Sequence, residues 1–317
     1  MSGGEPEILS LAAGDLALEL CPNLGGSVTG LRWQHPAAGW IDLLRPTSRA
    51  SLASRNMEGV SCFPLTPFSN RLRRGRFEFA GREIVLPMNT EGPHVEHGHG
   101  WQRPWQALDG APDRAVLRFT HRADAWPFDY AIEQRFQLHA GGLDVELMAR
   151  NDSDRAMPFG FGLHPYFPRT PGCRLTAPVA GFWETDAEVM PLRHIPPPRG
   201  LDPTPGFAVA DQRLDNAFTG WQGRAIIDWP ERATRLTMTA TAAFGFLVVY
   251  IPPDEDYFCA EPVSNCTDAF NLAHARADTG MLVVEPNRQV SARVAFLPEC
   301  APDPTTPAIL RSDRSRC

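Results

Sequence analysis

The sequence contains no lysine, so all 30 of its basic residues are arginine. This absence excludes any mechanism that depends on a lysine Schiff base or a lysine general base. The formal net charge is −7 at pH 7, which argues against nucleic acid as a partner because a polyanion needs a positive surface. Proton transfer by this chain must therefore use histidine, carboxylates or other side chains.

The seven cysteines include no C-x-x-C pair, and this spacing predicts reduced thiols in place of a zinc cluster or a disulfide framework. No run of residues approaches the apolar length of a membrane span. Residues 1–7 lack the basic-then-apolar order of a secretion signal, so we expect a cytoplasmic protein that does not bind membranes. A glycine-rich phosphate loop and a G-x-S-x-G elbow are also missing, which gives no sign of a nicotinamide cofactor or a serine nucleophile.

Helical periodicity is nearly absent, and residues 51–55 are the best short candidate for a helix. Apolar and polar residues instead alternate over many short segments separated by glycine and proline. Residues 130–138 and 142–150 predict an antiparallel hairpin, and residues 75–86 predict a second one with its turn at Ala80-Gly81. The other predicted strands are 16–20, 27–33, 115–120, 224–229, 235–240, 246–250 and 289–296.

This pattern predicts an all-β protein, a large antiparallel sandwich with few short helices. No linker divides the chain, because the proline-rich residues 195–200 are followed by more strands of the same kind. We therefore expect one domain over residues 1–300 and a mobile tail over residues 301–317. Either a monomer or a homodimer is compatible with the sequence.

Residues 159–167, FGFGLHPYF, place one histidine among aromatic residues and glycines. Pro165 pushes His164 towards extended backbone geometry, and Gly160 and Gly162 leave room for something to approach the backbone. A packed core histidine and a functional imidazole are equally compatible with these residues.

Residues 63–72 place prolines around a Ser-Asn-Arg triplet, which predicts a rigid segment presenting Arg71. A guanidinium can hold a hydroxyl or a carboxylate with two hydrogen bonds, although a structural ion pair is the plainer interpretation.

Residues 94–105 contain His94, His97 and His99 around Glu96, a composition that could suggest zinc. On a strand, however, His97 and His99 share one face while Glu96 points away. We therefore predict no metal ion, and expect His97 to bind sugar or transfer protons beside tryptophans whose flat faces suit a pyranose.

Two later stretches each contain one carboxylate of interest. Asp215, in residues 214–221, belongs to an Asp-Asn pair that is also an ordinary turn signal. Glu261, in residues 258–271, has few charged neighbours in sequence, and a partly desolvated carboxylate gains the raised pKa that a general base requires. Asp268 and Asn271 are interpreted as residues that form a loop.

Taken together, these stretches resemble the aldose 1-epimerase (galactose mutarotase) family, and the matching features occur in the family's order over most of the chain. The matches are Asn70-Arg71, His97-Gly98, His164 with Tyr166-Phe167, Leu214-Asp215 with Phe218, and Glu261-Pro262 with residues 268–271.

The resemblance implies a β-sandwich of the galactose mutarotase type with a sugar cleft, in which Glu261 is the general base and His164 the general acid. It also implies that Asn70, Arg71, His97 and Asp215 hold sugar hydroxyls. The reaction is the interconversion of α and β anomers of a free aldose through ring opening and reclosure, without a cofactor or metal.

His94 and Asn216 depart from the family's galactose-specific pattern and leave the sugar open. Three alternatives also stay open: a hexose-6-phosphate 1-epimerase, suggested by the arginines around Arg71; a non-catalytic carbohydrate-binding protein; and a glycoside hydrolase using Asp215 and Glu261. His97 could also share the acid role with His164.

Overall fold

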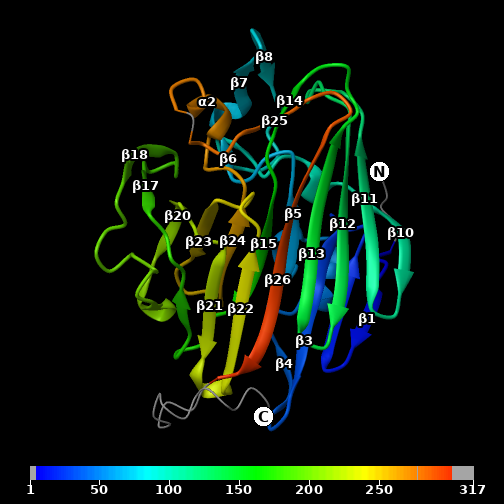
Figure 1. The fold of residues 1–317 in the computed structure, drawn as a ribbon, viewed down its shortest axis with the longest axis vertical. Helices are drawn as coiled ribbons and strands as arrows, with labels where there is room; N and C mark the ends of the chain where they lie inside the picture. The colour runs from blue at the N-terminus through cyan, green and yellow to red at the C-terminus, as the bar shows by residue number, and fades with distance from the viewer. Residues whose placement is uncertain (1–4, 277, 302–317) are drawn as a thin grey trace.

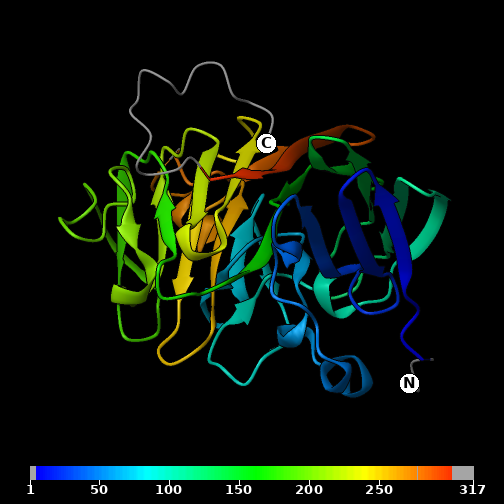
Figure 2. The same ribbon diagram turned by 90° about the horizontal axis from the view of Figure 1, so that it is seen from below.

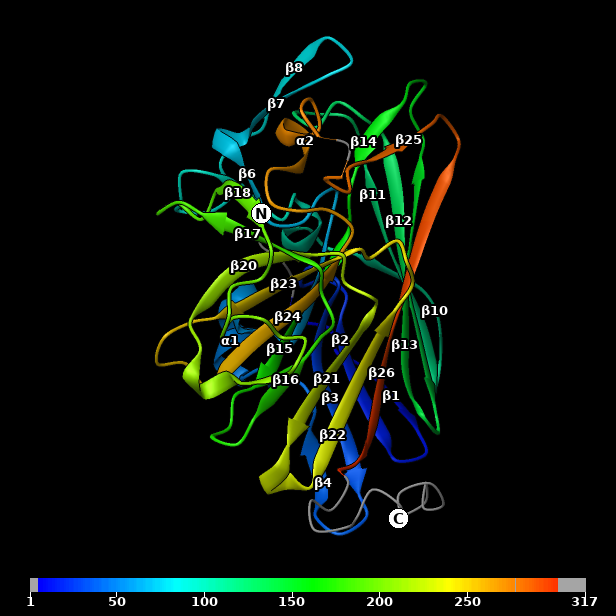
Figure 3. The ribbon, with the colours of Figure 1, turned by 60° about the vertical axis from the view of Figure 1, so that its left-hand side comes forward.

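The computed structural model describes residues 5–276 and 278–301, and most of them belong to two antiparallel sheets. Figure 1 looks through both layers, with β12, β13 and β26 in front of β3, β15 and β24. In the turned view of Figure 3, β15, β23 and β24 separate from β12, β13 and β26. The predicted all-β sandwich with few short helices is confirmed.

The larger sheet has eleven strands, and β4 pairs with β3 at its side. In spatial order the others are β1 (Leu9–Ala13), β2 (Leu16–Cys21), β3 (Ser27–His35), β5 (Cys62–Leu65), β15 (Gly162–Pro168), β24 (Tyr257–Val263), β23 (Phe246–Ile251), β20 (Leu214–Thr219), β17 (Gly181–Thr185) and β18 (Pro191–Ile195), with β4 at Gly39–Asp42.

The smaller sheet has nine strands, in the order β10 (Gln106–Ala111), β11 (Arg114–His121), β12 (Tyr130–His139), β13 (Gly142–Asn151), β26 (Gln289–Cys300), β22 (Thr234–Ala240), β21 (Arg224–Trp229), β16 (Arg174–Thr176) and β19 (Phe207–Ala208).

Short strand pairs and short helices lie in the connections between these strands. The pairs are β6 (Arg71–Leu72) with β9 (Val95–Glu96), β7 (Arg76–Phe79) with β8 (Arg82–Val85), and β14 (Met157–Phe159) with β25 (Leu282–Val284). The α-helices are α1 (Arg49–Ser54) and α2 (Ala269–Leu272), and the 3-10 turns are η1 (Met57–Gly59), η2 (Arg73–Gly75), η3 (Gly100–Gln102), η4 (Val209–Asp211) and η5 (Pro230–Arg232). Seen from below, α1 and β26 lie at opposite edges of the molecule (Figure 2).

Both predicted hairpins form. β12 and β13 pair from Tyr130 opposite Asn151 to His139 opposite Gly142. β7 and β8 meet at a turn in which Ala80 and Gly81 have φ of 50° and 72°, the two left-handed residues of a tight hairpin turn. The helix expected over residues 51–55 is α1, and the proline-rich residues 195–200 begin at the end of β18 and form the turn that follows it.

The tail expected to be mobile, residues 301–317, lies outside the described part of the chain except for Ala301. Among the described residues, no helix is both long and apolar enough to cross a membrane.

Alternation along β15 explains how one sheet supplies both core and site. Leu163 and Phe167 are buried in the hydrophobic core at 2% and 0% exposure. Burying a side chain of this size stabilises the fold by about 1.5–3 kcal/mol. His164 and Tyr166 lie on the other face of the strand, because successive side chains of a strand point to opposite faces. The packing of the core residues therefore fixes the direction in which His164 points.

Candidate functional site

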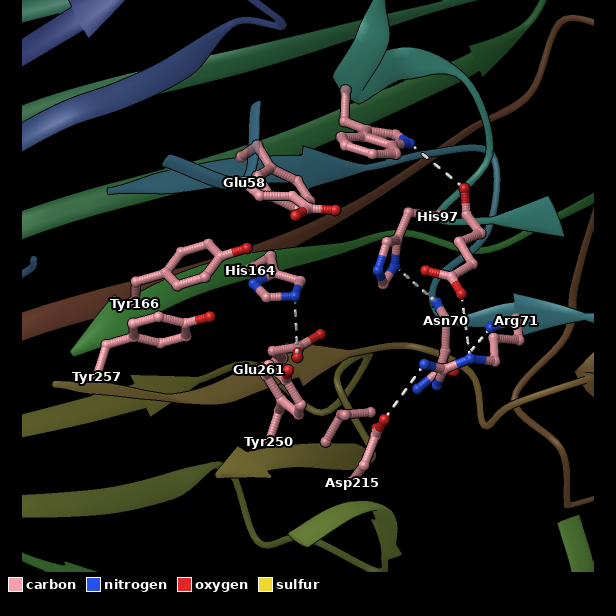
Figure 4. A pocket seen from close by; sticks show the side chains of 14 residues that line it. Glu58, Asn70, Arg71, His97, His164, Tyr166, Asp215, Tyr250, Tyr257 and Glu261 are labelled. Carbon is pink, nitrogen blue, oxygen red and sulfur yellow. Dashed lines mark hydrogen bonds and ion pairs between the residues drawn. The ribbon is translucent and has the colours of Figure 1, made fainter. Parts of the chain in front are cut away.

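A pocket of about 230 Å³ lies on the larger sheet, and all six residues singled out in the sequence line it. They come from β6, β15, β20 and β24 and from the loops beside β6 and β9 (Figure 4). These six are Asn70, Arg71, His97, His164, Asp215 and Glu261.

His164 and Glu261 are in direct contact at one end of the pocket, with His164 Nε2 3.3 Å from Glu261 Oε1 (Figure 4). The register brings them together, because β15 pairs with β24 from Gly162 opposite Val263 to Tyr166 opposite Cys259. Both side chains are buried, at 8% and 2% exposure. The second carboxyl oxygen of Glu261, Oε2, has no hydrogen-bond partner among the described residues. A buried carboxyl oxygen without a partner is costly, and a bound ligand with a hydroxyl group would satisfy it.

Burial shifts the pKa values of this pair in opposite directions. It raises the pKa of Glu261 well above the ordinary value of 4.5, and Asp215 adds to the shift through charge repulsion. The pKa of His164 is lowered to about 3, because the ring is buried. The ring is stacked between Phe63 and Tyr166, with centroids 4.6 Å and 4.7 Å away. The pair therefore holds one shared proton over a wide pH range.

His97 and Asn70 position each other. The backbone N–H of Asn70 donates to His97 Nδ1 at 3.1 Å, and the backbone N–H of His97 donates to the backbone carbonyl of Asn70 at 2.9 Å. Because Nδ1 accepts a hydrogen bond, the neutral ring carries its proton on Nε2. Burial, and secondarily His164 and Arg71, lower the pKa of His97 well below its ordinary value. His97 is therefore a neutral ring whose Nε2–H can donate to a bound oxygen.

The conformation of His97 depends on Gly98. Residues 97 and 98 both have left-handed backbones, with φ of 59° and 66°, and a β-carbon on Gly98 would overlap the Thr66 carbonyl. We expect Gly98→Ala to lower the free energy of unfolding by about 1–3 kcal/mol, measured by chemical denaturation. Gly39→Ala is the matched control, since Gly39 shares a positive φ of 76° but has nothing within 4 Å. Equal losses in the two variants would contradict a close approach at Gly98.

Arg71 bridges two carboxylates across the pocket. Its Nε lies 3.1 Å from Glu96 Oε1, and its Nη2 lies 3.2 Å from Asp215 Oδ2. Burial raises the pKa of Asp215, and the nearby guanidinium opposes that shift. The bridge fixes one end of the pocket as a rigid set of hydrogen-bonding groups.

The prediction that Glu96 points away from His97 was wrong, because both residues line the pocket. The alternation was extrapolated through a strand that ends early. β9 stops at Glu96, and the left-handed backbones of His97 and Gly98 reverse the directions of the following side chains. The side chain of His99 does not line this pocket; its Nε2 lies 2.9 Å from Tyr130 Oη.

The three histidines of residues 94–99 do not converge on one point. His94 Nε2 pairs with Glu188 at 3.2 Å, while His97 and His99 have the separate partners described above. Among the described residues, the group whose metal-ligand atoms lie within 4.8 Å of one another is His164, Cys259 and Glu261. Two of these three residues, His164 and Glu261, are the pair in direct contact described above.

The glycines of residues 159–167 have a different role from the one expected. A β-carbon on Gly160 would overlap Asn265 Oδ1, and one on Gly162 would come 2.7 Å from Val263. The space beside these glycines is therefore occupied by the protein's own β24 and the residues that follow it. Asp268 and Asn271 are loop-forming as expected, since Asp268 Oδ1 accepts from the Arg73 N–H and from Asn271 Nδ2.

Several lining residues were missed in the sequence, and alternation from a known site residue could have found some of them. Tyr166 lies two residues beyond His164, and Tyr257 lies four before Glu261 on the same strand. The Arg45 guanidinium packs over both tyrosine rings, at 4.0 Å and 4.3 Å from their centroids. Of the two tryptophans expected to face a sugar, Trp101 lines the pocket and Trp105 does not. The missed residues are Glu58, Phe63, Tyr166, Val248, Tyr250 and Tyr257.

Comparisons with known proteins agree on one family. The family model for aldose 1-epimerase matches residues 7–297. The Escherichia coli K12 protein YphB is 32% identical over 304 residues, covering 92% of this chain and 99% of that one. A crystal structure of a candidate aldose 1-epimerase from Escherichia coli K12 has a TM-score of 0.83 at 30% identity, with 93% and 99% of the two chains covered. A galactose mutarotase-like protein from Clostridium acetobutylicum shares the fold, with a TM-score of 0.83 at 20% identity over 95% and 97% of the chains. This chain belongs to the aldose 1-epimerase family.

Proposed function

We propose that this protein is an aldose 1-epimerase that interconverts the α and β anomers of a free aldose. The observation that carries the proposal is the contact between Glu261 and His164, a buried carboxyl and imidazole with oppositely shifted pKa values at the end of a polar pocket. Anomer interconversion needs a base at the C1 hydroxyl and an acid at the ring oxygen. One pair that shares one proton supplies both.

Glu261 and His164 can carry out all the proton transfers of the reaction between them. Ring opening starts from the form of the pair in which the proton lies on His164: Glu261 as carboxylate takes the proton of the C1 hydroxyl, while His164 gives its proton to the ring oxygen, and the C1–O bond of the ring breaks. The raised pKa of Glu261 and the lowered pKa of His164 favour the other form, with the proton on Glu261, and reclosure starts from that form. The open-chain aldehyde then rotates about C1–C2. On reclosure Glu261 returns its proton to the former carbonyl oxygen, and His164 removes the proton from the attacking hydroxyl. The pair holds one proton at every stage, so no external acid or base is consumed.

The remaining four predicted residues suit the binding of sugar hydroxyls. The Arg71–Asp215 pair offers guanidinium donors beside carboxylate acceptors, as vicinal hydroxyls require. His97 offers its Nε2–H, and Asn70 fixes the orientation of that ring. We assign the acid role to His164, because its Nε2 lies 3.3 Å from the Glu261 carboxyl with which it can exchange a proton, whereas the His97 ring is held by the Asn70 N–H.

The charges around the pocket favour a neutral sugar over a sugar phosphate. The lining includes four carboxyl groups, those of Glu58, Glu96, Asp215 and Glu261, but only one arginine, which already pairs with two of them. A phosphate would have to displace one of these partners and would meet the remaining negative charge. No other feature of the pocket favours the hexose-6-phosphate alternative.

The test is polarimetry on freshly dissolved α-D-glucose and α-D-galactose with purified protein. We expect the optical rotation to reach its equilibrium value faster than in buffer, in proportion to the protein concentration. Sugar binding without any acceleration would instead favour a carbohydrate-binding protein, and release of phenol from aryl glycosides would favour a hydrolase.

A further inference from the structure

The imidazole of His164 lacks the hydrogen bond that usually orients a histidine in proton transfer. Such a histidine is normally held by a partner at the ring nitrogen that does not react. Nε2 of His164 faces Glu261, but the buried Nδ1 has no hydrogen-bond partner among the described residues. Another kind of contact must therefore hold the plane of this ring.

Stacked aromatic rings supply that contact. The Tyr166 ring covers one face of the imidazole, with centroids 4.7 Å apart and planes inclined by 26°. Phe63 covers the other face at 4.6 Å and 28°, and Trp101 stacks on Phe63 at 5.1 Å and 24°. In such a close-packed stack the imidazole can tilt only if its neighbours also move.

Arg45 closes one end of the stack. Its guanidinium carbon lies 4.0 Å from the ring centroid of Tyr166 and 4.3 Å from that of Tyr257, and these two rings are 5.2 Å apart. A guanidinium is attracted to an aromatic face, and its flat shape lets it cover that face. Tyr166 and Tyr257 line the pocket and Arg45 does not, so Arg45 can affect the reaction only through such neighbours.

Arg45 is itself fixed by hydrogen bonds of its side chain and its backbone. Nη2 donates to the backbone carbonyl of Val60 at 2.9 Å, and also to that of Glu58. The backbone N–H donates to the Tyr166 carbonyl at 2.8 Å, and the backbone carbonyl accepts from Ser61 Oγ at 2.6 Å. The guanidinium is therefore anchored to β15, the strand that carries the stacked histidine.

We propose that Arg45 is a positioning residue for the proton transfers: by clamping the ring of Tyr166, it holds the imidazole of His164 with Nε2 pointing at Glu261. The inference rests on the proposed epimerase function, in which this nitrogen must reach both the carboxyl group and the ring oxygen of the sugar. Misplacing a reacting group by about 1 Å can lower a rate by about 10²-fold, so a residue outside the pocket can matter for kcat.

The experiment measures mutarotation of α-D-glucose by Arg45→Met and Arg45→Lys, with kcat corrected for the folded fraction given by circular dichroism. Lysine keeps the positive charge, which adds to the larger effect of burial in lowering the pKa of His164, but it lacks the flat surface that stacks on a ring. We expect kcat to fall about tenfold or more in both variants, with KM within about threefold of wild type, because the groups that hold the sugar are unchanged.

Arg155→Met is the matched control and should keep the wild-type kcat. The Arg155 guanidinium also lies over an aromatic ring, 5.2 Å from the centroid of Phe128, and it donates to the backbone carbonyl of Pro127 at 2.6 Å. None of these three residues lines the pocket. The control therefore removes the same kind of contact at a place where no reacting group depends on it.

A second measurement asks whether Arg45 acts through the ring that it covers. In a Tyr166→Leu background that ring is gone, so Arg45→Met should lower kcat by less than about a further threefold. A full further loss there, wild-type kcat in Arg45→Met, complete rescue by Arg45→Lys, or a rise in KM in place of the fall in kcat would overturn the positioning role alone. A wild-type protein that does not accelerate mutarotation would overturn the epimerase function and this inference together.

Discussion

Replacing Glu261 by glutamine is expected to lower kcat for mutarotation by about 10²–10⁴-fold, the usual contribution of a positioned general acid or base. Glutamine keeps the size of the side chain and its ability to hydrogen-bond, but it cannot accept the proton of the C1 hydroxyl. Polarimetry at saturating sugar measures the effect, with the uncatalysed rate subtracted. Because the binding groups on Arg71 and Asp215 are untouched, KM should change much less than kcat.

Glu83→Gln is the matched control, since Glu83 is a carboxylate with a 66% exposed side chain that pairs with Arg76 outside the pocket. It should mutarotate at the wild-type rate. A Glu261→Gln variant with wild-type kcat would remove the carboxyl from the mechanism and leave the pocket as a binding site.

The pH dependence of wild-type kcat/KM is the second large effect. The active pair holds one proton, so activity should fall when a second proton is added and when the shared proton is lost. The second proton is added near the lowered His164 pKa of about 3. The shared proton is lost only above the raised pKa of Glu261, so activity should persist well above pH 4.5 and then fall about tenfold per pH unit.

The His164→Ala variant tests the sign of this argument. Without the imidazole there is no proton to share, and Glu261 acts only when it is ionised. The residual rate should therefore rise with pH through the raised pKa of Glu261, opposite to the alkaline fall of wild type. A wild-type profile that simply rises through a pKa near 4.5 would mean that Glu261 titrates as an ordinary exposed carboxyl.

Strands that alternate and contain no proline were the part of the fold that could be predicted, as with β12 and β13. The strands that carry the site were harder, because each of the central strands β5, β15 and β24 contains a proline. Proline cannot donate to a sheet ladder, and strand rules assign it to edges or turns. Pro165, interpreted from the sequence only as a restraint on His164, lies in the middle of the eleven-stranded sheet.

The site could be predicted only as separate pieces. Local patterns singled out Arg71 and Glu261, but nothing local reveals that Arg71 pairs with a residue 144 positions away. The resemblance to a family supplied that convergence, and the register of β15 and β24 gives its physical cause. Glu96 was misplaced because the end of β9 depends on two left-handed residues, and only one of them is a glycine.

The most direct test of the shared-proton pair is a double-mutant cycle on kcat with Glu261→Gln, His164→Ala and the double variant. If the two side chains move one proton as a unit, removing both should cost about as much as the more damaging single change. We therefore predict a double variant within about threefold of the slower single variant, since the remaining pocket still orients the sugar. Losses that multiply would contradict the pair, because they would mean that carboxyl and imidazole act independently.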